Sequence, residues 1–134
     1  MPHVHYAAAK SSETTQMKNS QFLKRTQFAL AGIASAFKSE KSFRTQLLAA
    51  VGVAIVLLIL RPTALWCAML VGVSALVLVT ELLNTAIENL ADHLHPEVHP
   101  QIKIVKDCAA GAVLLASVCA LLIAAVFAYD YFGR

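Results

Sequence analysis

Three long apolar runs, each bounded by polar residues, occupy most of the chain after residue 46. The runs are Leu47–Leu60, Ala64–Val79 and Ala109–Tyr129. A helix needs about 20 mostly apolar residues to cross the ~30 Å hydrocarbon core of a membrane. The first run reaches this length with Phe43, and the second by continuing through the apolar side of residues 80–90. We therefore predict transmembrane helices at 43–60, 64–90 and 107–129.

The end of the second predicted helix carries a cluster of polar side chains. At about 100° per residue they fall within about 100° of arc, on one face of the helix. Ionisable groups at membrane depth are unfavourable and are usually functional. A solvated helix end is the simpler alternative, but such a face usually alternates carboxylates with Lys or Arg. The clustered residues are Glu81, Asn84, Thr85, Glu88 and Asp92.

The chain before the first span divides into two parts. Residues 1–20 are polar, lack periodicity and contain no apolar segment of a signal peptide, so we predict a disordered tail. In residues 22–38, apolar side chains share one face and basic side chains lie elsewhere, which is typical of an amphipathic helix in the membrane interface. That face comprises Phe22, Leu23, Leu30, Ile33 and Phe37. We treat residues 21–134 as one membrane domain.

Composition and charge agree with an all-α integral membrane protein. The chain is 58% hydrophobic with a mean hydropathy of +0.66. Only 14% of its residues are charged, against about 25% in soluble domains. All of the basic residues except Arg61 and Arg134 precede the first span or lie between the second and third. The positive-inside rule then predicts a cytoplasmic N-terminus and a cytoplasmic loop at 94–105, with a tight turn at 61–63.

Cysteine and histidine residues give weaker signals. The three cysteines lie in or beside predicted spans without CxxC spacing, which favours a role as small apolar side chains. Three histidines surround Pro96 in the cytoplasmic loop, where we favour exposed side chains over a metal cluster. The two sets are Cys67, Cys108 and Cys119, and His93, His95 and His99.

The remaining polar residues favour phosphoryl transfer at the membrane surface. Carboxylates can hold a hard divalent ion, a lysine can bind phosphate oxygens, and a carboxylate at membrane depth can accept a proton from a lipid hydroxyl. Glu40 precedes the first span, and Lys106-Asp107 precedes the third. No Walker loop or soluble-kinase motif is present. A non-enzymatic proton- or ion-conducting oligomer that uses Glu81 and Asp92 as relay groups is the alternative.

The sequence around these residues resembles the prokaryotic diacylglycerol kinase family, which includes the undecaprenol kinases. The similarity extends from Phe22 to Tyr129. It is most specific in ELLNTAIEN, which begins at Glu81, and in the spacing to Lys106-Asp107 and the AAGAV that starts at Ala109. The resemblance implies a small lipid kinase in the bacterial cytoplasmic membrane. It also implies ATP as donor, Mg²⁺ as cofactor, a homotrimer with composite active sites, and no nucleic-acid partner.

Matched position by position, the resemblance implies a role for each polar residue. Glu81 would be the catalytic base beside the lipid hydroxyl. Glu40 and Glu88 would coordinate Mg²⁺ on ATP, and Lys106 and Asp107 would lie at the nucleotide phosphates. Further residues would support the site (Asn84, Asp92), contact nucleotide from the loop (Glu97, His99) or approach the lipid (Phe43, Arg44). Val98 stands where the family usually has tyrosine.

The acceptor lipid and the oligomer depend on weaker sequence features. Thr85 and Asn89 resemble the undecaprenol kinase branch, whereas the family as a whole bears the name of diacylglycerol. Diacylglycerol is therefore our first prediction and undecaprenol the alternative. Small residues at Ala68, Gly72 and Ala75 permit the close helix approach that drives association in lipid.

Overall fold

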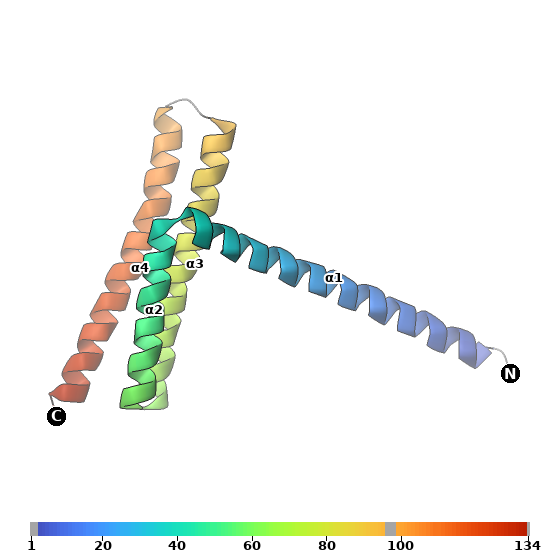
Figure 1. Ribbon diagram of the computed structural model, residues 1–134, viewed down its shortest axis with the longest axis horizontal. Coiled ribbons are helices and arrows are strands. Elements are labelled where there is room, and N and C mark those ends of the chain that lie inside the picture. Colours follow the sequence, from blue (N-terminus) through green and yellow to red (C-terminus); the bar gives the residue numbers. More distant parts are fainter. Residues whose placement is uncertain (1–2, 96–98, 134) are drawn as a thin grey trace. The chain divides into compact units, whose positions relative to one another are not determined.

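The computed structural model describes residues 3–95 and 99–133, with side chains described from residue 21 onward. Four helices account for most of them (Figure 1). They are α1 (His3–Ser39), α2 (Lys41–Leu60), α3 (Ala64–Leu94) and α4 (Pro100–Phe132). The chain separates into two units, Met1–Ser35 and Ala36–Arg134, and each is described by itself.

Helix α1 begins much earlier than the helix we predicted at 22–38. It starts at His3 and includes most of the segment for which we predicted disorder. No glycine or proline occurs between Pro2 and Gly32, so no residue in this stretch interrupts a helix. The apolar side chains of Phe22, Leu23 and Leu30 are exposed. An interfacial position for this helix, like a domain boundary at residue 20, stays a prediction.

The prediction of three membrane-spanning helices is confirmed. Helices α2, α3 and α4 are each long and apolar enough to cross a membrane. Helix α2 ends at Leu60 and α3 begins at Ala64, as predicted. Arg61 ends α2 in the left-handed conformation, with φ 47° and ψ 53°, and its N–H donates to the carbonyl of Leu57. Pro62 follows and lacks the N–H that a continuing helix would need.

At the end of the bundle opposite this turn, the helices extend beyond the predicted membrane spans. Helix α3 continues to Leu94 instead of residue 90, and α4 begins at Pro100 instead of residue 107. Proline is favoured at the first helical position. His99 caps α4, because its Nδ1 accepts a hydrogen bond from the N–H of Gln101 at 3.2 Å. At 1.5 Å per residue α3 and α4 are roughly 46 and 50 Å long, so both extend beyond a ~30 Å hydrocarbon core.

Helix α3 is the central element of this unit. It packs along α4 and, less extensively, against α2 (Figure 1). In the described part of the chain, no Cα atom of α2 lies within 8 Å of one in α4. A small core of Leu57, Leu70 and Phe127 joins the three helices toward the α2–α3 turn. Most other large apolar side chains are exposed, as a surface in contact with lipid requires.

Candidate active site

The polar face predicted for α3 includes two buried side chains. Glu81 is 3% exposed and Thr85 is 7% exposed, and both lie on the same face as the buried Leu70 and Val77. This face packs toward the neighbouring helices. Glu81 follows Ala64 by 17 residues, or about 26 Å along the helix axis. With Ala64 at one edge of a ~30 Å hydrocarbon core, Glu81 therefore lies just inside the other edge.

The carboxylate of Glu81 has no hydrogen-bond or ion-pair partner among the side chains that the structure describes. One turn further along α3, the Oδ1 atom of Asn84 is buried and also accepts no hydrogen bond. By contrast, the amide of Asn89 is satisfied, because its Nδ2 donates to the carbonyl of Thr85 at 2.8 Å. Buried polar atoms without partners are unfavourable and usually indicate a functional role. Glu81 and Asn84 are thus available to a bound molecule.

Farther along α3, charged residues pair across the helices. The Nζ atom of Lys106 on α4 donates to both carboxylate oxygens of Asp92 on α3, at 2.8 and 3.1 Å. Lys103 pairs with Asp107 one turn away on α4. The structure therefore brings together Asp92 and Lys106, two residues that the sequence analysis assigned to one site. It also shows that both residues predicted at the nucleotide phosphates, Lys106 and Asp107, already have partners of opposite charge.

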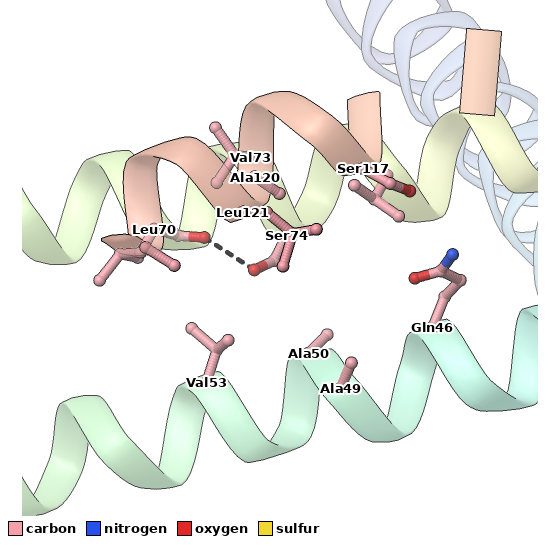
Figure 2. Close-up of a pocket in the computed structure, with 12 residues that line it drawn as sticks. Gln46, Ala49, Ala50, Val53, Leu70, Val73, Ser74, Ser117, Ala120 and Leu121 are labelled. Carbon is pink, nitrogen blue, oxygen red and sulfur yellow. Dashed lines mark hydrogen bonds between the residues drawn. The ribbon is translucent and has the colours of Figure 1, made fainter. Parts of the chain in front are cut away.

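A cavity of about 250 Å³ lies between α2, α3 and α4 (Figure 2). Its wall is mostly apolar and includes Val77, which precedes Glu81 by one turn, and each helix contributes one polar side chain. These are Gln46, Ser74 and Ser117. The Ser74 hydroxyl donates to the carbonyl of Leu70 at 2.8 Å. Helices α3 and α4 are antiparallel, and Asp92 on α3 pairs with Lys106 on α4. Glu81 precedes Asp92 by the same number of residues as Ser117 follows Lys106, so Ser117 lies about level with Glu81.

The residues predicted near the first span have distinct surroundings. Glu40 is the N-cap residue of α2 and is partly exposed, but its side chain makes no capping hydrogen bond. Phe43 is buried. The Arg44 guanidinium donates from Nη1 to the carbonyls of Phe37 and Lys38, each at 3.2 Å. Arg44 therefore satisfies carbonyls at the end of α1, and contact of Phe43 or Arg44 with lipid stays a prediction.

The histidine loop lies partly outside the described residues, which exclude Glu97 and Val98. His99 caps α4, and its ring centroid lies 6.5 Å from that of His95. Within the described ranges, no three His, Cys, Asp or Glu side chains are close enough together to hold a metal ion. Mg²⁺ on a nucleotide needs only one or two protein carboxylates, because phosphates supply other ligands. The oxygen donors of Glu40 and the partly buried Glu88 fit that requirement chemically.

Residues 27–128 match the family model described as prokaryotic diacylglycerol kinase. The chain belongs to this family. The matched range contains all of the candidate site residues, and the resemblance inferred from residues 81–107 is confirmed.

Three relatives named diacylglycerol kinase illustrate the similarity. The relative from a Synechocystis species is 40% identical over 97 residues, which is 72% of this chain and 55% of that protein. The Pseudomonas aeruginosa relative is 35% identical over 96 residues, 72% of this chain and 78% of that protein. The Escherichia coli K12 relative is 26% identical over 113 residues, 84% of this chain and 93% of that protein. The chain thus spans little more than half the length of the Synechocystis relative.

In this member of the prokaryotic diacylglycerol kinase family, sequence reasoning missed a second polar cluster. The indole Nε1 of Trp66 donates to Oδ2 of Asp130 at 3.1 Å, and the Tyr131 hydroxyl donates to the carbonyl of Leu60 at 3.0 Å. Asp130 and Tyr131 lie beyond the matched residues 27–128. A carboxylate placed directly after an apolar run, together with the single tryptophan in the first turn of α3, was the available signal.

Proposed function

We propose that this protein is an ATP-dependent membrane lipid kinase that phosphorylates the hydroxyl of diacylglycerol to give phosphatidic acid. The observation that carries the proposal is Glu81, a buried carboxylate without a described partner at the edge of the hydrocarbon core. Family membership supports the same reaction class. The polar extension of α3 and α4 beyond the hydrocarbon offers a surface for a soluble phosphoryl donor.

In this mechanism Glu81 is the general base. Its carboxylate accepts the proton of the acceptor hydroxyl as the hydroxyl oxygen bonds to the γ-phosphorus of ATP. The bond between the γ-phosphorus and the bridging oxygen to the β-phosphorus breaks, and ADP leaves. The cavity beside Val77 accommodates the apolar part of the acceptor next to the base. The acceptor then reaches Glu81 without leaving the membrane, and the buried Asn84 Oδ1 accepts a hydrogen bond at the same depth.

The nucleotide occupies the polar side of the same helix. Glu88 lies two turns beyond Glu81, about 10 Å along the axis, and helical side chains point back toward the N-terminus. Its carboxylate therefore leans toward the reaction centre. Glu40 and Glu88 would hold Mg²⁺, which when bound neutralises charge on the transferred phosphate. Lys106 binds phosphate oxygens by exchanging its bonds to Asp92 for bonds to the nucleotide.

Two alternative functions have specific support. Undecaprenol kinase activity is favoured by Thr85 and Asn89, as described above. A proton- or ion-conducting oligomer would use Glu81 and Asp92 as relay groups. Between Glu81 and the polar cluster of Trp66 and Asp130 near the turn, the described polar side chains that line the cavity are Gln46, Ser74 and Ser117, and Ser74 is bonded to its own helix. This favours the kinase over a conducting path.

The kinase would function as a homotrimer in the bacterial cytoplasmic membrane, with its N-terminus in the cytoplasm. Three helices with this little buried surface do not by themselves enclose both ATP and a lipid headgroup. Gly72 has no atom within 4 Å of the place where a Cβ would lie, so a neighbouring helix can approach α3 closely there. The basic residues on both sides of the bundle's polar end support the orientation.

The proposed function is tested by incubating the detergent-purified protein with radiolabelled ATP and Mg²⁺. Diacylglycerol and undecaprenol are offered in parallel in mixed micelles, and labelled lipid is separated from nucleotide. We expect label in phosphatidic acid, with less in undecaprenyl phosphate. Label found only in undecaprenyl phosphate would show that undecaprenol is the acceptor instead of diacylglycerol. The absence of labelled lipid with either acceptor would contradict the proposed kinase activity.

A further inference from the structure

The cavity between the three membrane helices contains two polar side chains that the proposed mechanism does not use. Figure 2 shows Gln46 of α2 and Ser117 of α4 at the same end of this cavity, which they reach from different helices. Both are partly buried, and neither makes a hydrogen bond with another residue in the described part of the chain. We call Gln46 and Ser117 the donor pair.

The hydroxyl of Ser117 differs from neighbouring hydroxyls on the membrane helices. A serine or threonine inside a helix can donate to the carbonyl four residues earlier. Ser74 donates in this way to Leu70 at 2.8 Å, and Thr80 donates to Leu76 at 3.0 Å. Ser117 makes no such bond within the described ranges. Its O–H is therefore available to a molecule in the cavity.

The donor pair lies near the depth of the proposed base. Ser117 is about level with Glu81, as the register of α3 and α4 shows. Gln46 precedes the end of α2 at Leu60 by 14 residues, or about 21 Å, whereas Glu81 lies about 26 Å from the start of α3 at Ala64. Because α2 and α3 meet at the turn, Gln46 lies roughly 5 Å deeper in the membrane than Glu81.

The cavity leads toward Glu81 along one face of α3. Leu70, Ser74, Val77 and Glu81 follow one another at intervals of three or four residues, so they share that face. The first three line the cavity. A lipid whose chains occupy the cavity therefore presents its hydroxyl to Glu81 and the groups next to the hydroxyl to the donor pair.

The donor pair matches the ester groups of a glycerol lipid. The serine O–H and the glutamine amide N–H groups both donate, and polar groups without partners are unfavourable in the hydrocarbon core. An ester carbonyl only accepts. In a glycerol diester, a carbonyl oxygen is about five bonds of ~1.2–1.5 Å from the free hydroxyl, so roughly 5 Å away. A polyprenol has no oxygen other than its hydroxyl and offers the donor pair no acceptor.

We propose that Gln46 and Ser117 determine the acceptor class by donating hydrogen bonds to the ester carbonyls of a glycerol diester. This inference rests on the proposed kinase function and assigns its acceptor specificity to two residues outside the carboxylate cluster. The amide of Gln46 bonds to one carbonyl and the hydroxyl of Ser117 to the other, while the free hydroxyl of the lipid lies at Glu81. A polyprenol leaves both donors unpaired and is the poorer acceptor.

The test compares diacylglycerol with a dialkylglycerol of the same chain lengths, in which ether links replace the esters and no carbonyl is present. Both acceptors carry the same free hydroxyl. Their kcat/KM values are measured in mixed micelles with saturating MgATP. We expect the wild-type value to be about five- to a hundredfold higher for the diester, as two hydrogen bonds of ordinary strength imply. Equal values would overturn this inference and leave the kinase in place. An absence of turnover with both acceptors and with undecaprenol would contradict the kinase, and this inference with it.

Variants assign the preference to the donor pair. Gln46→Leu and Ser117→Ala should each lower the ester-to-ether ratio of kcat/KM about two- to tenfold. Ser74→Ala is the matched control, because Ser74 lies in the same cavity but is bonded to its own helix, and it should leave the ratio unchanged. Partial misfolding lowers both rates of a variant equally and does not change the ratio. A wild-type ratio in both donor variants would overturn the assignment. The wild-type comparison needs no variant, so it remains decisive if a variant fails to fold.

Discussion

Replacing Glu81 by glutamine tests the assignment of the catalytic base. Glutamine has nearly the same shape, and no described side chain donates to or pairs with Glu81, so the substitution breaks no described hydrogen bond or ion pair. We therefore expect stability to change by less than about 0.5 kcal/mol. The amide cannot take the hydroxyl proton. Loss of a general base typically lowers the rate about 10²–10⁴-fold, or ~3–5 kcal/mol in the barrier.

The assay measures kcat and KM with diacylglycerol in mixed micelles and, separately, the binding of a fluorescent ATP analogue. We expect a large fall in kcat while nucleotide binding and the thermal unfolding midpoint stay unchanged. Asp130→Asn removes a carboxylate at the opposite end of the bundle and should retain full kcat. If Glu81→Gln keeps more than about a tenth of the wild-type kcat, a loss below ~1.4 kcal/mol, the base lies elsewhere. Asp92 is then the next candidate.

Three further predictions follow from the same structure. Glu88→Gln should raise KM for MgATP more than it lowers kcat, and excess EDTA should abolish turnover; turnover that persists in EDTA would contradict a metal requirement. In a variant without native cysteines, a cysteine introduced at position 101 should not be labelled by a membrane-impermeant thiol reagent applied outside intact cells. Strong labelling would show that the topology is opposite to the predicted one. Trp66→Phe removes the bond to Asp130 and should destabilise the protein by about 0.5–1.5 kcal/mol, measured by unfolding in detergent; an unchanged stability would show that this bond contributes nothing.

The number and location of the membrane helices followed from the sequence because they depend on local composition. An apolar run of sufficient length is itself the physical requirement for crossing the hydrocarbon core. The ends of α3 and α4 could not be predicted from the sequence in this way, because the length of an apolar run corresponds to the thickness of the hydrocarbon core and not to the full length of the helix. Both helices continue into water, where the cap at His99 and the pairing of the two helices determine where they end.

Part of the candidate site could likewise be predicted from the sequence, and part of it could not. The buried face that contains Glu81 and Thr85 was predictable from helical periodicity. The pairing of Asp92 with Lys106 depends on the register between two helices, which the composition of neither helix specifies. Trp66 and Asp130 are 64 residues apart, and no local pattern relates them. Contacts that depend on tertiary register were therefore the part that sequence reasoning missed.

The uninterrupted helix from Ala64 to Leu94 fixes both the distance and the direction of Glu81 relative to the α2–α3 turn. One inserted residue between the turn and Glu81 would move the carboxylate about 1.5 Å outward and rotate it about 100° around the axis. The rotation matters more, because it would turn Glu81 away from the buried face of α3. An insertion of seven residues restores the direction to within about 20° but moves the carboxylate roughly 10 Å outward, from just inside the hydrocarbon edge to about 6 Å beyond it. The length of this segment is therefore fixed by two independent constraints, one angular and one axial, which no single insertion or deletion satisfies together.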